Sequence, residues 1–186
     1  MVQNKSVLNE IERVTLGHYD SHADAFWAGT KDHDVTQNYT EFLAPFPSGK
    51  ILDILDFGCG PGRDIKYFHS LGHRPIGLEG SAVFCRMAHQ YTQCQILHQQ
   101  FLSLALPQQA FDGIFANASL FHIPSQALPR VLRELREALR SGGILFLSNP
   151  RGTQEGWNGQ RYGHYMELSD SQAYLHAAGF EVIHHY

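Results

Sequence analysis

Two acidic residues and a run of glycines form the most specific chemical pattern in this sequence. Asp56 precedes a Gly-Cys-Gly-Pro-Gly turn at 58–62, and Glu79 follows 21 residues after Gly58. Glycine lacks a Cβ, so the turn can adopt positive φ and a ligand can approach its backbone closely. A carboxylate ahead of the turn suits a cationic ligand, and one about 20 residues later can accept both hydroxyls of a ribose. The pattern predicts a site for an adenosine with a cationic tail.

The turn departs from the fingerprint of dinucleotide-binding proteins. That fingerprint requires glycine at positions 58, 60 and 63, and position 63 is Arg. Glu79 alone would fit a nicotinamide dinucleotide equally well, because that cofactor also contains a ribose. A nicotinamide-dependent oxidoreductase therefore stays as an alternative function.

An apolar run places the turn at the end of a strand. The run at 51–57 holds five apolar side chains nearly back to back, as in a strand buried on both faces of a parallel sheet. Strands and helices then alternate, which predicts an α/β fold with a doubly wound, mostly parallel Rossmann-like sheet and right-handed crossovers. The strands are expected at 50–56, 74–78, 94–98, 111–116, 143–148 and 180–184, with later helices centred on 65–71, 82–88, 128–139 and 168–178.

Helices are expected ahead of the sheet as well. Apolar residues at helical spacing, with breaks near Gly29 and Pro45, predict three helices before residue 48. We interpret residues 1–48 as a helical cap on a core at 49–186, within a single domain, since 186 residues are few for two. The three helices are expected at 6–16, 20–28 and 35–44. For helix 168–178, Ser169 and Gln172 are expected to form a capping box, and Gly142 should follow the end of helix 128–139.

Composition narrows the class of partner. A hydrophobic content of 43% predicts a packed core, and a net charge of −4 without a basic run argues against nucleic acid. No signal region or apolar stretch of 18 residues is present, so we expect a cytoplasmic protein without a membrane partner. Three cysteines without CxxC spacing and 12 dispersed histidines predict neither disulfides nor a metal site. The expected partner is a small molecule, and the expected state is a monomer or homodimer.

The motif DFGCGPGRD at 56–64 resembles that of the class I S-adenosylmethionine-dependent methyltransferase family, small-molecule type, over residues 19–184. The resemblance implies S-adenosylmethionine as cofactor and S-adenosylhomocysteine as product. It places Asp56 at the methionine end, Glu79 on the ribose, and Gln100 where the family commonly has an acid at the adenine. Tyr19 matches a segment that closes over the cofactor. The full set assigned to the cofactor is Tyr19, Asp56, Gly58, Cys59, Gly60, Gly62, Arg63, Glu79, Gly80, Ser81, Gln100, Phe101, Ala116 and Asn117.

Three residues are candidates for chemistry at the methyl group. His122 lies in the segment 115–124, which resembles the loop that lines the methyl-transfer site, and it could accept a proton or orient the acceptor. Its alternative role is to cap or bridge that loop. His33, between two aspartates, could act as a base or belong to a solvated turn. Tyr19 completes the catalytic candidates.

The stretch 148–165 is expected to cover the acceptor. It follows the fifth strand and combines aromatic and arginine side chains with glycines, a composition typical of functional loops. An arginine there could bind a carboxylate with its planar fork. The alternative is a surface loop whose Trp157 packs on a helix. With His33 and His122, the acceptor set is Arg151, Trp157, Arg161 and Tyr162.

We therefore predict methyl transfer to a small, anionic metabolite by in-line displacement, in which a base is needed only for a protonated acceptor. A non-catalytic S-adenosylmethionine-binding sensor or subunit is the alternative. The family usually pairs a seventh, antiparallel strand with the sixth, and the sequence ends at Tyr186 without room for it. We interpret this as truncation, ahead of an edge left open or covered by a partner.

Overall fold

Five parallel strands form the central sheet of the computed structural model, which describes residues 2–186 and the side chains of residues 5–186. The strand order β3-β2-β1-β4-β5 puts the first strand at the centre, and every neighbouring pair is parallel. The order reverses between β1 and β4, which is where such sheets bind ligands. The predicted doubly wound α/β class is confirmed. The strands are β1 (Asp53–Phe57), β2 (Arg74–Glu79), β3 (Ile96–His98), β4 (Phe111–Asn117) and β5 (Leu139–Ser148).

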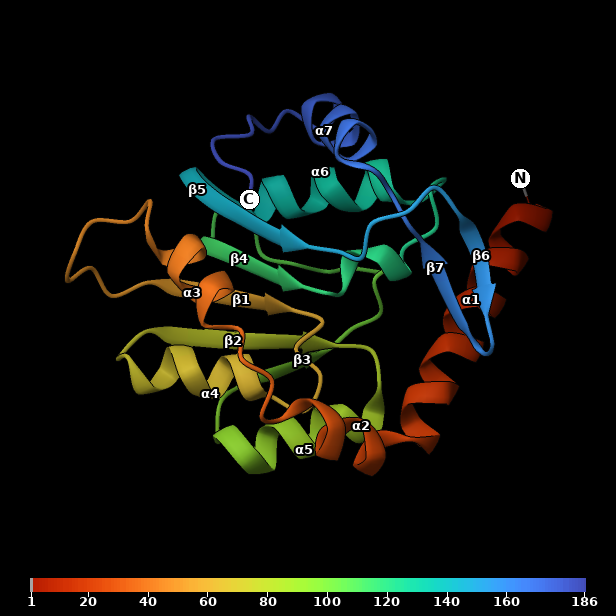
Figure 1. Cartoon of the computed structure of the whole chain (residues 1–186), viewed down its shortest axis with the longest axis horizontal. Helices are drawn as coiled ribbons and strands as arrows, with labels where there is room; N and C mark the ends of the chain where they lie inside the picture. Colours follow the sequence, from red (N-terminus) through yellow and green to blue (C-terminus); the bar gives the residue numbers. More distant parts are fainter. Residues whose placement is uncertain (1) are drawn as a thin grey trace.

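Helices cover both faces of the sheet (Figure 1). Successive strand side chains point to opposite faces, so Ile54 packs toward α3 and α4 while Leu55 packs toward α6. Both side chains are fully buried, which explains why neighbouring positions of β1 are apolar. One face carries α3 (Thr36–Leu43), α4 (Arg63–Ser70) and α5 (Ala82–Thr92); the other carries α6 (Leu128–Ala138), on which α7 (Leu168–Ala177) packs.

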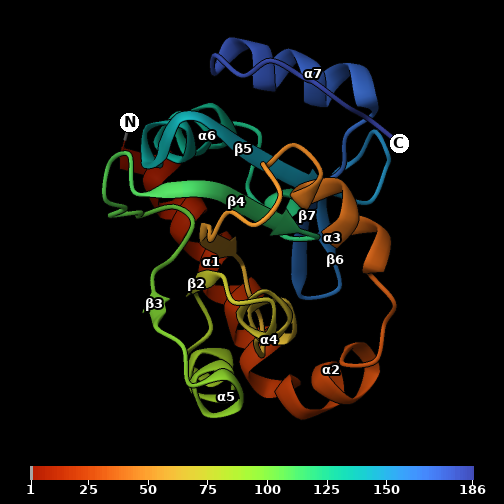
Figure 2. The same cartoon turned by 90° about the vertical axis from the view of Figure 1, so that its left-hand side faces the viewer.

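The first helix, α1 (Val2–Ser21), runs beyond the carboxyl ends of the strands (Figure 1). It continues through residue 17 without a break, so the expected boundary between helices at 6–16 and 20–28 was wrong. A Cβ added at Gly17 would meet no heavy atom within 4 Å, so no neighbouring element presses on the helix at this residue. α2 (Ala23–Thr30) follows, and Figure 2 shows it beside α4 and α5.

The stretch 148–165 contains regular structure. It forms an antiparallel hairpin of β6 (Glu155–Asn158) and β7 (Arg161–His164), joined by two residues. Gly159 has φ +62°, as the tight turns of hairpins require. The hairpin lies alongside α1, beyond the ends of the strands (Figure 1).

Three sequence-based expectations about elements are corrected. No strand forms at 180–184, because helix α7 ends with the Phe180 amide bonded to the Leu175 carbonyl and the chain then runs as coil. Gly142 lies inside β5 with φ +73°, where the register with β4 shifts, instead of following a helix. Helix α7 begins at Leu168 with Glu167 as its cap residue, so Ser169 lies within the first turn and caps nothing.

Within the described residues, no helix combines the length and apolar character needed to cross a membrane.

Candidate active site

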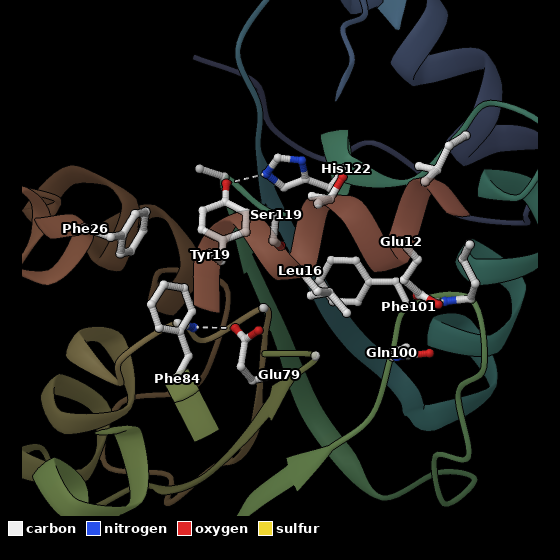
Figure 3. A pocket seen from close by; sticks show the side chains of 17 residues that line it. Glu12, Leu16, Tyr19, Phe26, Glu79, Phe84, Gln100, Phe101, Ser119 and His122 are labelled. Carbon is white, nitrogen blue, oxygen red and sulfur yellow. Dashed lines mark hydrogen bonds between the residues drawn. The ribbon is translucent and has the colours of Figure 1, made fainter. Parts of the chain in front are cut away.

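A cavity lies under α1 at the carboxyl ends of the strands, and Figure 3 shows the side chains that converge on it. It gathers residues from the glycine turn, from the ends of β2 and β3, and from the loop after β4. Eight of the residues predicted from the sequence line it: Tyr19, Gly58, Gly60, Glu79, Gly80, Gln100, Phe101 and His122.

Glu79 connects the glycine turn to the start of α5. Its Oε2 accepts a hydrogen bond from the Gly60 amide at 2.9 Å, and its Oε1 accepts one from the Ser81 amide at 2.8 Å. Burial raises the pKa of Glu79, and these amides oppose the shift. Each carboxylate oxygen can accept a second bond, so the side chain can still receive ribose hydroxyls from the cavity it lines.

The turn requires glycine at position 58. Gly58 has φ +79°, and an added Cβ would lie 2.5 Å from the Ser119 Cβ and 3.0 Å from Phe101 Cζ. Phe101 is itself fixed by stacking on Phe57, with ring centroids 4.4 Å apart. Ser119 and Phe101 therefore leave no room for a side chain at position 58.

Asp56 lies outside the cavity, behind the turn. It is almost fully buried, and its Oδ2 has no hydrogen-bond partner among the described residues. Burial raises the pKa of Asp56 well above its usual range, and the nearby Asp64 carboxylate adds to the shift. A buried carboxylate oxygen without a partner is costly, so a cation in its vicinity would be favourable.

Several positions assigned to the cofactor instead hold the turn in place. Asp64 accepts hydrogen bonds from Tyr39 Oη at 2.6 Å, Arg63 Nε at 2.6 Å and Asn117 Nδ2 at 3.2 Å. Ser81 caps α5 by accepting from the Phe84 amide at 3.0 Å. The remaining positions outside the cavity are Cys59 and Gly62, which pack near Ile65 and Ala88, and Ala116, which belongs to the core.

His122 joins three elements at the other end of the cavity. It ends the short helix η1 (Leu120–His122), and its Nε2 lies 2.7 Å from the Tyr19 hydroxyl of α1. Its Nδ1 lies 2.7 Å from the Tyr162 carbonyl oxygen of β7. A carbonyl can only accept, so Nδ1 carries the proton and Nε2 accepts from Tyr19. Burial lowers the pKa of His122 to about 4, which keeps the ring neutral.

The hairpin packs against α1 and η1 at this end of the cavity. The Tyr162 amide donates to Thr15 Oγ1 of α1 at 3.1 Å. Burial raises the pKa of Tyr19, and the nearby positive charge of Arg161 opposes this rise. Ala118, which also lines the cavity, has φ +53°, a backbone conformation that residues other than glycine rarely adopt.

Of the predicted acceptor residues only His122 lines the cavity, and Arg161 and Tyr162 lie next to it in β7. The other three lie farther away. His33 is exposed in the turn between α2 and α3. Arg151 points to His185, with nitrogens 3.3 Å apart. Trp157 is 48% exposed and packs edge-on against Tyr162 within the hairpin, at 5.5 Å between centroids, and not on a helix.

Sequence reasoning missed the contribution of α1. Glu12 and Leu16 line the cavity together with Tyr19, all from one face of the helix (Figure 3). Glu12 accepts a hydrogen bond from the Leu102 amide at 3.0 Å, beside Gln100. Their spacing of four and then three residues marks one helical face, a signal that an analysis of apolar residues alone passes over. Ala118 and Ser119 also line the cavity and belong to the segment 115–124 that the sequence places at the methyl-transfer site, and Phe26 lies in the segment matched to the one that closes over the cofactor. The other residues that sequence reasoning missed are Ile11, Thr15, Phe84 and Leu102.

These features define an α/β protein with a nucleotide-type cofactor site at the switch point of its sheet. Comparison with known proteins agrees: residues 54–143 match the family described as a methyltransferase domain. Together with the similar proteins described next, this match to nearly half of the chain confirms the resemblance to the class I S-adenosylmethionine-dependent methyltransferase family that the motif at 56–64 predicted.

Similar proteins include methyltransferases and a cyclase. A trans-aconitate 2-methyltransferase from Azoarcus sp. (strain BH72) is 32% identical over 122 residues, which are 64% of this chain and 47% of that protein. The 1,6-didemethyltoxoflavin-N1-methyltransferase of Burkholderia thailandensis, solved with S-adenosylhomocysteine, has a TM-score of 0.75 at 21% identity over 92% of this chain and 78% of its own. The cyclase SpnF has a TM-score of 0.75 at 20% identity, over 94% and 73%. The structural likenesses show the fold.

Proposed function

We propose that this protein is an S-adenosylmethionine-dependent methyltransferase acting on a small, anionic metabolite. One observation carries the proposal: a single cavity joins the glycine turn and Glu79 at one side to Tyr19 and His122 at the other. The first group suits the adenosine of the cofactor, and the second suits an acceptor next to its sulfonium.

The residues have distinct duties in this proposal. S-adenosylmethionine, when bound, supplies a methyl group activated on a sulfonium. Glu79 receives the ribose hydroxyls, and Phe101, stacked on Phe57, supplies an apolar wall for the base. The buried carboxylate of Asp56 favours the cationic end of the cofactor. α1 and the hairpin exclude water, so alignment of acceptor and methyl group can supply most of the rate enhancement.

The relatives bear on the nature of the acceptor. The matching protein from Azoarcus is named for trans-aconitate, a small acid, which supports a small, anionic acceptor. The chain spans 47% of the length of that relative and 40% of that of a sterol methyltransferase it also matches. We therefore propose only the class of acceptor. We also propose a cytoplasmic location, which the three free cysteines of this chain favour.

Two measurements test the function. Isothermal titration should show S-adenosylhomocysteine binding in the micromolar range and no binding of NAD; binding of NAD alone would establish the oxidoreductase instead. A metabolite extract incubated with methyl-labelled S-adenosylmethionine should then yield labelled product. Tight binding without any transfer would support a sensor or subunit.

A further inference from the structure

An acidic side chain lines the cavity at the end that lies away from His122. Glu12 enters from α1 and is half-buried. Figure 3 shows it grouped with Phe101 and Gln100, whereas Tyr19 and His122 are joined by a dashed line at the other end. Phe101 supplies the apolar wall proposed for the base of the cofactor. The carboxylate of Glu12 therefore lies at the part of the cavity where the edge of that base is expected.

The spacing of residues on α1 agrees with this placement. Leu16 lies over the end of β2, because a Cβ added at Gly80 would be 2.9 Å from the Leu16 Cδ2. Gly80 directly follows Glu79, to which the ribose is assigned. Glu12 lies one turn from Leu16, about 6 Å along the helix at 1.5 Å per residue. A purine extends over a similar length from its sugar to the group at its position 6, so Glu12 can meet that group.

The Glu12 carboxylate is held in place by contacts with two other segments. Its Oε1 accepts a hydrogen bond from the Leu102 amide at 3.0 Å. The Leu102 carbonyl accepts one from Arg130 Nη2 of α6 at 2.9 Å, and Arg130 also donates to Glu134 at 2.7 Å. Burial raises the pKa of Glu12, whereas the Leu102 amide and the charge of Arg130 lower it. A carboxylate can accept about four hydrogen bonds, so its Oε2 can still accept one from a ligand.

The hydroxyl groups of two other residues in the cavity wall are used within the protein. The Ser119 hydroxyl donates to the Phe57 carbonyl at 2.5 Å. Thr15 Oγ1 accepts from the Tyr162 amide of the hairpin at 3.1 Å. Both contacts lie away from the Leu102 amide that holds Glu12. Recognition of the edge of the base is therefore left to Glu12 and to one neighbouring side chain, Gln100.

Gln100 is the less selective of these two side chains. It is exposed, and its amide group offers an oxygen that accepts and a nitrogen that donates. A rotation of the amide would suit a ligand of either kind. The carboxylate of Glu12 has no hydrogen to donate, so it can bind only a donor. Glu12 can thus distinguish an amino group from a carbonyl oxygen.

We propose that Glu12 selects adenine as the base of the cofactor, with its Oε2 accepting a hydrogen bond from the exocyclic amino group. The inference rests on the proposed function, and it names the residue that recognises the base. A base with a carbonyl oxygen at the same position, such as hypoxanthine, would place a second acceptor against the carboxylate. Discrimination then comes from repulsion as well as from the lost hydrogen bond.

Titration calorimetry on the full chain tests the inference with three ligands that differ only at position 6 of the purine. S-adenosylhomocysteine carries an amino group there, S-inosylhomocysteine a carbonyl oxygen, and the corresponding unsubstituted purine analogue a hydrogen. We expect the first to bind about tenfold or more tightly than each of the others. Equal affinities for all three would overturn the inference and leave the proposed function intact. No binding of S-adenosylhomocysteine would overturn the proposed function itself.

Glu12→Gln replaces an acceptor by a donor at the base. The glutamine oxygen can still accept from the Leu102 amide, which leaves the N–H groups directed at the ligand. We expect the preference for S-adenosylhomocysteine over S-inosylhomocysteine to fall about tenfold or more. A merely structural role would weaken both ligands alike, so an unchanged ratio would overturn the inference. Glu10→Gln is the matched control, since Glu10 is an exposed residue of α1 that pairs with Arg13, and it should leave the ratio unchanged.

Gln100→Ala tests the neighbouring side chain in the same titrations. We expect it to keep the ratio of the two affinities, because the carboxylate that rejects the carbonyl oxygen is still present. Loss of the preference in Gln100→Ala, with an unchanged ratio in Glu12→Gln, would give the selectivity to Gln100 and refute the inference. Thermal melting checks that each variant is folded. The three ligands on the parent protein test the same point without any substitution.

Discussion

Two acids that the sequence places in one motif have different surroundings. Glu79 faces the cavity with each oxygen on a backbone amide, so its position is fixed before any ligand arrives. Asp56 lies behind the glycine turn, beside Asp64, and keeps one oxygen without a partner among the described residues. Glu79 therefore suits hydrogen bonding to hydroxyls, while Asp56 acts through its charge.

Replacing Asp56 should weaken the binding of S-adenosylhomocysteine without lowering the stability of the fold. Asp56→Asn keeps the shape and removes a buried charge next to Asp64, so we expect no fall in melting temperature and a loss of affinity for S-adenosylhomocysteine of about tenfold. Titration calorimetry and thermal melting measure the two effects, with the exposed Asp170→Asn in α7 as control. An unchanged affinity would mean that Asp56 serves the fold alone.

A pair of glycine variants isolates crowding from backbone strain. Gly58→Ala and Gly72→Ala both place a side chain at positive φ, +79° and +82°, which costs about 1–2 kcal/mol each. A Cβ at 72 meets no atom within 4 Å, whereas one at 58 meets Ser119 at 2.5 Å, which should add about 1–3 kcal/mol. Denaturant unfolding should rank Gly58→Ala as the less stable, and only that variant should lose S-adenosylhomocysteine binding. Equal stabilities would refute the crowding.

At the scale of elements, the amino ends of the strands are tied by charges. Asp53 of β1 accepts from Arg74 of β2 at 2.6 Å and from Arg140 of β5 at 2.8 Å. Arg140 also donates to Asp112 of β4 at 2.9 Å, and Lys50 joins Asp112 at 2.9 Å. The network spans four neighbouring strands at the end opposite the cavity, so it can be perturbed without touching the active site.

The pKa of Asp53 gives this network a pH dependence. Arg74, with support from Arg140, lowers this pKa from 3.8 to about 2. A lowered carboxyl pKa stabilises the fold above the unfolded value, and that stabilisation is lost as pH falls from about 4 to about 2. Asp53→Asn should thus melt about 2–4 °C below the parent at pH 7, with the gap closing by about pH 2. A gap that persists at pH 2 would contradict the assignment.

The elements that periodicity could predict are those whose apolar faces are buried. β1, β4 and α6 carry runs that match the observed core, and the glycine turn could be located because Gly58 needs φ above zero. The hairpin at 155–164 could not be found this way, since its exposed residues carry no alternating apolar pattern. Residues 180–184 have an apolar pattern, yet they run as coil after α7, and His184 Nε2 lies 3.3 Å from Glu41 Oε2.

The site was predictable to the extent that it is local in sequence. The turn and the ends of β2 and β3 follow from strand order, and His122 follows from the loop after β4. The contribution of Glu12 and Leu16 depends on how α1 crosses the sheet, and the place of Arg161 depends on hairpin packing. Both are long-range properties that no short window of sequence contains.

On the scale of the whole molecule, two separate segments meet beside the cavity. α1 comes from the start of the chain and the hairpin from near its end, and they meet where Tyr162 donates to Thr15. The sheet beneath them has a core of its own. We therefore expect that contacts between α1 and the hairpin help to hold α1 over the cavity.

Hydrogen exchange should reveal this division. Addition of S-adenosylhomocysteine should slow exchange in residues 11–19 and 155–164 by about tenfold or more, because ligand contacts favour the closed state, while β1 and β4 change little. Mass spectrometry of peptides covers all four regions in one experiment. The absence of any effect in α1 would show that it is not part of the binding site.

Ala118 has a consequence for engineering. Its backbone has φ +53°, and its amide donates a hydrogen bond to the Ser148 carbonyl. It lies just before η1, the short helix that ends at His122. Glycine there would relieve strain of about 1 kcal/mol in the folded chain, but it would give the unfolded chain a similar gain in freedom. The two effects nearly cancel, so a thermostability screen would treat the position as neutral. Only selection for turnover would detect the loosened loop.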